Sequence, residues 1–367
     1  MNFPSFSSIP QHFVQQKSAY IEQNKKNMPV SKPKAQVMIQ ESQQMAPERH
    51  QLFTQTQMSQ ASQEPPHLAS DVFRTSAFGD QFFDTEEPIR DVDGANCKND
   101  LFCSEYAPRI MAYLQQQERQ FGQIEDYTTS FQRCLQPKMV TIVADWLLDV
   151  AVEYKLQTET YFLAINLMHR FLTRREIARD RLQLVGVSAI WIAAKYEECI
   201  APPCDDFAYI TDDTYTCDQI RAMEREILNT LDWEGLTAPT ARTFLKRYCH
   251  VADSSVNTAL LSAYLTELCQ RSTELMRFLP SMVAASSVAL SRMATTGEFW
   301  DATMQHYTGY GVGDMKDCLI AIHSLWVSCP MSDEGTEGAA ASKKYARGRY
   351  SRVSKVDPPS IDFIHAY

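Results

Sequence analysis

The sequence is poor in the motifs that build enzyme and metal sites. Its 12 glycines form no G-x-x-x-x-G-K-[ST] or G-x-S-x-G string, and H-E-x-x-H does not occur. Its eight histidines are scattered and its ten cysteines include no C-x-x-C pair, so neither residue type has the spacing of a zinc site. Because each of these sites needs several reacting or ligating atoms at one point, we expect no catalytic residue, no metal and no cofactor.

Long apolar runs and excess positive charge are missing as well. No stretch reaches the roughly 18 apolar residues that cross a bilayer, and the amino terminus lacks the basic and apolar regions of a secretory signal. Acidic side chains outnumber basic ones by 45 to 35, and by 28 to 20 between residues 101 and 330. A nucleic-acid binder needs a basic face that neutralises phosphates. The sequence therefore predicts reduced cysteines and no membrane or nucleic-acid partner.

The two ends of the chain differ in amino-acid composition from its middle. Residues 1–100 are rich in Gln, Ser and Pro, which bury too little apolar surface to offset chain entropy, so we expect a disordered N-terminal arm. Residues 331–367 turn polar and carry six basic side chains, which predicts a mobile, basic C-terminal tail. Residues 101–136 contain Tyr106 and Ile110 at helical spacing, which predicts an N-terminal helix followed by a linker.

Two segments indicate two helical bundles. Residues 182–195 and 279–292 are apolar on every side, rich in Ala, Ser, Gly and Val, and each ends in one basic residue. A helix without a polar face must be surrounded by other helices, and small side chains let those neighbours approach closely. Each segment therefore predicts the centre of a bundle. We expect an all-α fold with one domain at residues 137–235 and a similar domain at residues 236–330.

Lys195 and Glu224 form the most informative pair of charged residues. Lys195 ends a run of eleven uncharged residues, at the carbonyl end of its predicted helix, where a cation is favourable. Glu224 borders the apolar stripe of Ile220 and Ile227, where a carboxylate is costly unless it is paired. We predict that the two side chains meet. The residues alone leave two interpretations open: a purely structural ion pair, or a rigid polar site for the backbone carbonyls of a partner.

A second pattern concerns the predicted helix at residues 139–154. One stripe of this helix holds four apolar residues: Met139, Ile142, Val143 and Trp146. Further apolar side chains widen the stripe beyond a single core-facing arc. The stripe is either covered on all sides or partly exposed as a groove for short linear motifs.

Several strings of the sequence resemble the pattern of one known family. They include EYKLQTET, RLQLVGVSA, AAKYEE, ITDDTYT, RAMEREIL and APTARTFL, and the resemblance extends over residues 106–359. In these strings the chain is similar to the cyclins, and most closely to A-type cyclins, with B-type cyclins as the near alternative. The resemblance implies two tandem five-helix cyclin-box domains after an N-terminal helix. It also implies a regulatory subunit, not an enzyme, that binds and allosterically activates a cyclin-dependent protein kinase in the control of S phase and mitosis.

The resemblance also implies roles for particular residues. The kinase-binding positions of the family fall on Lys195, Tyr196, Glu197, Glu198 and Glu224. The family's patch that docks substrates or inhibitors with Arg-x-Leu motifs falls on Met139, Ile142, Val143, Trp146, Asp149, Leu182 and Gln183. The family string M-R-A-I-L reads M-V-T-I-V here, and Asp149 stands where the family has a longer Glu. We therefore expect Arg-x-Leu motifs to bind more weakly than to the family's usual patch.

Timed destruction is a further implication of the resemblance. Arg49 and Leu52 form an Arg-x-x-Leu string, which matches a degradation signal read by ubiquitin-ligase machinery. We expect the protein in the nucleus and the cytoplasm. Two alternatives stay open at this point: a degenerate cyclin that binds a kinase with altered substrate docking, and a cyclin-fold transcription factor, which would need a basic face.

Overall fold

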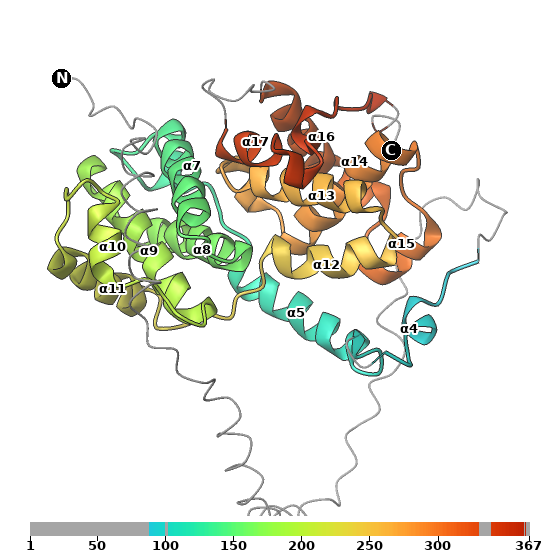
Figure 1. The fold of residues 1–367 in the computed structure, drawn as a ribbon, viewed down its shortest axis with the longest axis horizontal. Coiled ribbons are helices and arrows are strands. Elements are labelled where there is room, and N and C mark those ends of the chain that lie inside the picture. Colours follow the sequence, from blue (N-terminus) through green and yellow to red (C-terminus); the bar gives the residue numbers. More distant parts are fainter. Residues whose placement is uncertain (1–87, 100–101, 330–338, 363, 365–367) are drawn as a thin grey trace, which may run out of the picture. The chain divides into compact units, whose positions relative to one another are not determined.

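The computed structural model describes residues 88–99, 102–329, 339–362 and 364, all within one compact unit (Figure 1). This described part of the chain contains helices and connecting turns but no strand, which confirms the all-α prediction. Arg49 and Leu52 lie outside the described residues.

The first bundle consists of five helices, and one of them, α9 (Leu182–Glu197), is buried at its centre. They are α7 (Pro137–Glu153), α8 (Thr158–Arg174), α9 (Leu182–Glu197), α10 (Cys204–Tyr209) and α11 (Cys217–Thr230). Residues 184–194 of α9 are all buried, because α7, α8 and α11 pack around a helix made largely of small side chains. At Gly186 a Cβ atom would come within 2.8 Å of Val143 Cγ1, so α7 approaches the α9 backbone directly.

The second bundle repeats this arrangement. It consists of α12 (Ala241–Val251), α13 (Val256–Cys269), α14 (Pro280–Thr296), α15 (Ala302–Thr308) and α16 (Val312–Ser328). The central helix is α14, which is buried along residues 283–292 by α12, α13 and α16. Both predicted bundle centres are therefore confirmed, and Figure 1 shows the two groups of helices in green and in yellow to red.

The leading helix α5 (Ala107–Phe121) is anchored at its end by a buried carboxylate. Glu118 of α5 is 1% exposed and accepts hydrogen bonds from the backbone N–H of Ser281 at 2.8 Å and from its hydroxyl at 2.5 Å. Ser281 lies in the first turn of α14, where the unpaired N–H groups favour an anion. The short helix α6 (Tyr127–Ser130) follows α5, and its Tyr127 hydroxyl lies 2.7 Å from Nδ1 of His169 in α8.

The prediction of a disordered arm over residues 1–100 is wrong for residues 88–99. This segment forms a short helix, α4 (Val92–Ala95), and packs on the second bundle. Asp93 pairs with Arg247 of α12 at 2.7 Å, and the backbone N–H of Val92 donates to the Tyr307 hydroxyl at 2.9 Å. These partners stand far away in the sequence, so the local composition gave no sign of them.

The prediction of a mobile tail is wrong for residues 339–362. They form α17 (Ala340–Tyr345) and two short 3-10 helices, η4 (Gly348–Tyr350) and η5 (Val353–Lys355). The anchor is the buried Glu267 of α13, whose carboxylate accepts hydrogen bonds from Lys344 at 2.7 and 2.8 Å and from the Tyr345 hydroxyl at 2.9 Å. Basic charge at one end of this segment is thus neutralised inside the fold.

Candidate functional site

Lys195 and Glu224 meet at the surface of the first bundle, as their sequence positions predicted. The Lys195 ammonium forms an ion pair with Glu224 Oε1 and lies 3.6 Å from the centre of the Trp191 ring. A cation over an indole face is attracted by the negative face of the ring. The Lys195 and Glu224 side chains remain 38% and 17% exposed, so the fold orients the pair without covering it.

The local sequence explains the position of Glu224. The Thr216 hydroxyl accepts from the backbone N–H of Gln219, and the Gln219 side chain accepts from the backbone N–H of Thr216, which together form a capping box. This cap fixes the start of α11, and its stripe of Ile220, Met223 and Ile227 is buried. Glu224 follows Met223 at the edge of the stripe, which directs its carboxylate toward the last turn of α9.

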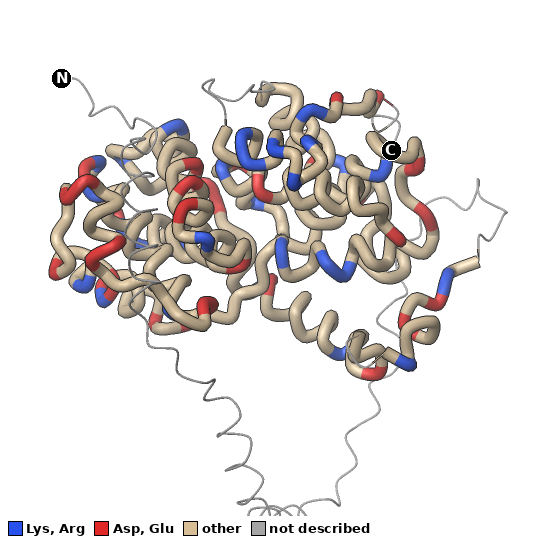
Figure 2. The backbone as a smooth tube through the Cα atoms, viewed as in Figure 1, with Lys and Arg blue, Asp and Glu red and all other residues tan. Residues whose placement is uncertain are grey.

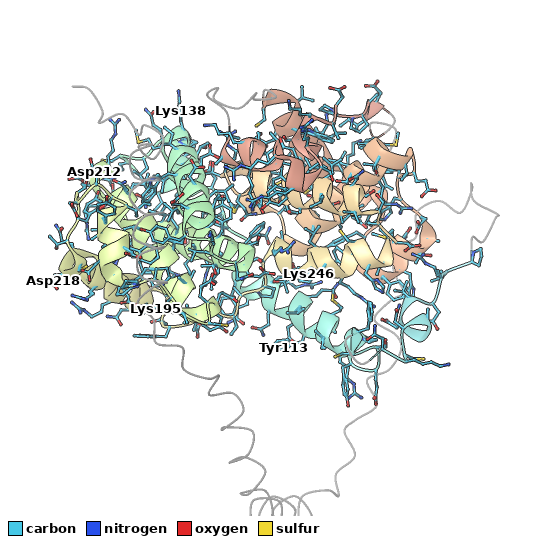
Figure 3. All side chains as sticks on the ribbon, viewed as in Figure 1. Tyr113, Lys138, Lys195, Asp212, Asp218 and Lys246 are labelled. Carbon is cyan, nitrogen blue, oxygen red and sulfur yellow. The ribbon has the colours of Figure 1, made fainter. Side chains whose placement is uncertain are left out.

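Exposed apolar side chains lie beside the ion pair. Tyr196 is 47% exposed and Ile200, just after α9, is 90% exposed. In Figure 3 Lys195 lies at the lower margin of the first bundle. A charged pair flanked by exposed aromatic and aliphatic side chains has the composition of a protein-binding surface, because such contacts exclude water around a central polar group.

Glu197 and Glu198 have different environments. Glu197 is exposed overall, and the partial burial of its carboxyl, together with the nearby carboxylates of Glu159 and Glu198, raises its pKa. Glu198 is half-buried, and its Oε1 accepts hydrogen bonds from the Gln157 backbone N–H at 2.7 Å and from the Thr160 hydroxyl at 2.5 Å. Glu198 therefore acts as a cap for the first turn of α8, a use inside the fold that the sequence analysis did not anticipate.

The seven predicted docking residues divide into a buried floor and an exposed rim. Val143 and Leu182 are 2% and 3% exposed and pack between α7 and α9. Ile142 is 37% exposed, and the other four members are half-buried: Met139, Trp146, Asp149 and Gln183. The wide apolar stripe of α7 is thus mostly core, and a narrow part of it faces solvent.

Asp149 and Asp145 provide acidic charge on α7. Burial raises the pKa of Asp149 to about 6, a shift that Asp145 reinforces and that Lys343 and Arg347 oppose. Burial also raises the pKa of Asp145, although Asp145 pairs with Arg271 at 2.9 Å. Of the cations near Asp149, Lys343 lies in α17, which packs on α7, and Arg347 lies two residues after the end of α17.

Two features of this surface escaped the sequence analysis. Trp191 was assigned only to the apolar helix, although its position four residues before Lys195 is a local signal that places its ring on the same helix face as the ammonium. The apolar stripe of α5 was interpreted as a helix signal, yet Tyr106, Ile110 and Tyr113 are 56%, 46% and 57% exposed. Such a stripe on a helix that is anchored at its far end is typical of a contact surface.

The described residues contain no group of three or more His, Cys, Asp or Glu side chains placed to hold a metal ion. Among the same residues, no helix is both long enough and apolar enough to span a bilayer. No disulfide joins any of the ten cysteines, all of which lie among the described residues.

Comparison with known proteins identifies the family of the two bundles. The profile described as Cyclin, N-terminal domain matches residues 109–235, and the profile described as Cyclin, C-terminal domain matches residues 239–359. Cyclin-A1-1 of Oryza sativa subsp. japonica is 38% identical over 283 residues, which cover 75% of this chain and 54% of that protein. Cyclin-A1 of Mus musculus is 37% identical over 259 residues, which cover 70% of this chain and 60% of that protein. The chain thus spans less than two thirds of the length of these relatives.

A solved structure supports the fold. The X-ray structure of a viral cyclin from herpesvirus saimiri matches with a TM-score of 0.53 and 14% sequence identity, covering 60% of this chain and 97% of that one. At this identity the match shows a shared architecture of two helical bundles.

Proposed function

The chain belongs to the cyclin family, and we propose that it binds a cyclin-dependent serine/threonine protein kinase as a regulatory subunit and activates it allosterically. The observation that carries this proposal is the oriented but uncovered pair of Lys195 and Glu224, with Tyr196 and Ile200 exposed beside it. The subunit supplies shape and charge, and the kinase supplies the reacting groups.

The mechanism follows from what a kinase needs in order to be active. Its catalytic Lys must pair with a Glu on a regulatory helix, and the position of that helix decides whether the pair forms. Lys195 has N–H donors left beyond Glu224, because an ammonium carries three hydrogens. In the proposed complex it donates to backbone carbonyls at the end of the kinase helix, while Glu224 and the Trp191 ring keep the ammonium in place.

The energetic requirement can be estimated. A ligand shifts a two-state equilibrium only by the difference in its affinity for the two states. To convert a kinase from 1% active to 99% active, the interface must favour the inward helix by about 5.5 kcal/mol. One ion-dipole contact cannot provide this, so we assign the remainder to exposed apolar side chains, which include the adjacent Tyr196 and the stripe of α5 that contains Tyr113. Figure 3 shows Lys195 and Tyr113 on the same margin of the molecule in that view.

Substitution of the pair tests this function. Lys195→Ala and Glu224→Ala remove a partly exposed ion pair, which costs the fold at most about 1 kcal/mol. We expect kinase activation to fall at least about tenfold, measured as phosphate transfer to a histone substrate, with unchanged helical circular dichroism.

A neighbouring ion pair provides the matched control. Arg181 and Glu226 pair at 2.9 Å between the start of α9 and the same helix α11, with side chains 44% and 34% exposed. Arg181→Ala and Glu226→Ala should leave activation unchanged. Full activation by Lys195→Ala and Glu224→Ala, or equal losses in both pairs of variants, would show that the Lys195 pair has no special role.

A second part of the proposal concerns substrate recruitment. We assign the half-exposed rim of α7, with Ile142 and Trp146, to the leucine of an Arg-x-Leu motif and Asp149 to its arginine. The narrow exposed area supports a weak site, because little apolar surface is available for burial. Presence in the nucleus and the cytoplasm, and destruction through Arg49 and Leu52, are also part of the proposed function.

Co-purification from cell extract separates this function from its alternatives. A complex with an active kinase supports the regulatory subunit, and a complex with an inactive kinase supports a degenerate cyclin. Salt-sensitive DNA binding without a kinase would favour a cyclin-fold transcription factor, which the net charge of −10 argues against.

A further inference from the structure

The C-terminal segment carries a concentration of positive charge that the kinase-binding surface does not use. Residues 343–355 contain six basic side chains and no acidic one, in a chain with a net charge of −10. Lys344 is paired with the buried Glu267. The arginines at 347, 349 and 352 are all exposed, and Figure 2 shows basic residues gathered around α17 and the chain that follows it. We call Arg347, Arg349 and Arg352 the arginine turn.

The arginine turn is held in a defined shape by packing on both sides. The Tyr345 ring, fixed by its bond to Glu267, lies 4.8 Å from the Tyr350 ring, and the Arg349 guanidinium lies 4.7 Å from the centre of that second ring. After the turn, Val353 is 2% exposed. An anchored turn presents its charges without the entropy cost of ordering a flexible tail.

The backbone of the turn is also unusual. Ser351 and Arg352 both adopt left-handed conformations, with φ of 53° and 55°. Side chains other than glycine enter this region at a cost, and such residues concentrate at functional sites. The two residues connect η4 to η5.

One end of the arginine turn, at Arg347, lies near the docking rim of α7. The backbone N–H of Ala340 donates to the Asp145 carboxylate, which sets α17 against α7. Further along, Lys343 and Arg347 lie close enough to Asp149 to lower its pKa against the effect of burial. A peptide whose arginine reaches Asp149 therefore passes next to Arg347.

We propose that the arginine turn binds a phosphoserine or phosphothreonine in the same protein that docks its Arg-x-Leu motif on α7, an inference that rests on the proposed docking function. Guanidinium groups match phosphate oxygens in a two-pronged geometry, and a phosphate at pH 7 carries more charge than a carboxylate. Substrates of a serine/threonine kinase acquire such groups, so prior phosphorylation strengthens the docking of the same substrate.

Other partners fit the geometry less well. An import receptor takes a basic signal in extended form, whereas Tyr345 and Val353 of this segment are buried. A nucleic acid would meet the carboxylates of Asp145 and Asp149 on the adjoining helix, and repulsion by these groups opposes a polyphosphate. A peptide that carries one phosphate near one arginine fits both features, because its phosphate pairs with the arginines of the turn and its arginine pairs with the carboxylates of α7.

The test measures peptide affinity by fluorescence anisotropy at one fixed salt concentration of about 0.15 M, because charge contacts weaken with salt. Each peptide contains one Arg-x-Leu motif and one serine, placed about three to ten residues before or after it and prepared with and without phosphate. Three proteins are compared. The first is the unsubstituted full chain, and the second is a triple variant that carries Arg347→Ala, Arg349→Ala and Arg352→Ala together. The third is a control variant that loses three other exposed arginines. The control substitutions are Arg133→Ala, Arg175→Ala and Arg277→Ala.

At one or more spacings we expect phosphorylation to increase affinity at least about fivefold for the full chain and for the control variant, and not for the variant of the arginine turn. The unphosphorylated peptide should bind all three proteins equally. No gain at any spacing, or the same gain in both variants, would overturn the proposal. Binding of a DNA duplex that the arginine turn variant loses would assign the turn to nucleic acid instead.

The peptides also separate this inference from the docking function on which it rests. If the phosphorylated peptide binds through the arginines while the unphosphorylated one fails at every concentration, the docking rim of α7 is wrong and the phosphate site is right. If both peptides bind equally and Ile142→Ala weakens both, the rim is right and the phosphate site is wrong. If neither peptide binds, both assignments are wrong.

Discussion

Acid should weaken the fold through one buried imidazole, that of His169 in α8. The ring is 1% exposed, and its Nδ1 lies 2.7 Å from the Tyr127 hydroxyl. Its Nε2 finds no hydrogen-bond partner within the described part of the molecule. Burial lowers the pKa of His169 from an ordinary 6.5 to about 4, because the interior offers no compensation for a second proton.

The shift gives both the sign and the size of the effect. The unfolded chain takes up a proton on His169 below pH 6.5, whereas the folded chain resists until about pH 4. The stability that depends on the neutral ring is therefore fully present above pH 6.5 and is lost as the pH falls toward 4. A difference of about 2.5 pKa units corresponds to a total of about 3.4 kcal/mol, and about 2 kcal/mol of it is lost by pH 5.

The double variant Tyr127→Phe, His169→Leu removes the Tyr127 hydroxyl and the His169 imidazole, and with the imidazole its titration. Urea unfolding of this variant and of the full chain at pH 7.5 and pH 5 measures the free energy of unfolding. We expect the full chain to lose about 2 kcal/mol more than the double variant between these pH values. Carboxyl groups with a raised pKa, such as Glu118, remain in both proteins, so their opposite dependence on pH cancels.

Tyr127→Phe alone is the control, because it keeps the imidazole and should keep the extra loss at acid pH. Parallel stability profiles for the full chain and the double variant would refute the reasoning, since His169 would then titrate equally in the folded and unfolded states.

Three further predictions concern docking, the C-terminal segment and turnover. Binding of an Arg-x-Leu peptide should weaken up to about tenfold between pH 7.5 and pH 5, because protonation near pH 6 removes the charge of Asp149. The variant Asp149→Asn should bind the peptide weakly at both pH values. An equally steep pH profile for this variant would contradict the assignment of Asp149 to the arginine of the peptide. Glu267→Ala should lower the free energy of unfolding by about 3–5 kcal/mol, because it leaves the Lys344 ammonium buried without its partner. Trypsin should then cut the chain within residues 339–362. An uncut segment would show that other contacts are enough to hold it. The double substitution Arg49→Ala, Leu52→Ala should lengthen the half-life of the chain in mitotic extract, and an unchanged half-life would remove the degradation signal.

The two bundle centres and the ion pair were predictable because each depends on a local imbalance. Residues 184–194 have no polar side, so only burial on all sides is stable for that helix. Glu224 is a carboxylate at the edge of a buried stripe, which demands a cation, and Lys195 is the cation at the rim of the central helix. Neither inference needed knowledge of distant parts of the chain.

The terminal segments were missed because their stability comes from distant partners. Asp93 depends on Arg247, 154 residues away, and Lys344 depends on Glu267. A polar segment looks disordered when its partners are not known, since its own residues form no apolar stripe. Glu198 was assigned only to kinase binding for the same reason, because the Gln157 N–H group that it caps lies 41 residues earlier.

The central claim is that the surface around Lys195 and Glu224 contacts the regulatory helix of a kinase. The most direct measurement places a photoreactive phenylalanine analogue at Tyr196, irradiates the purified kinase complex and locates the cross-link by mass spectrometry. The same analogue at Val327, which is 60% exposed on the second bundle, is the control. We predict a cross-link from position 196 to the kinase regulatory helix and none from position 327. A stable complex in which position 196 cross-links to another part of the kinase, or to nothing, would contradict the account.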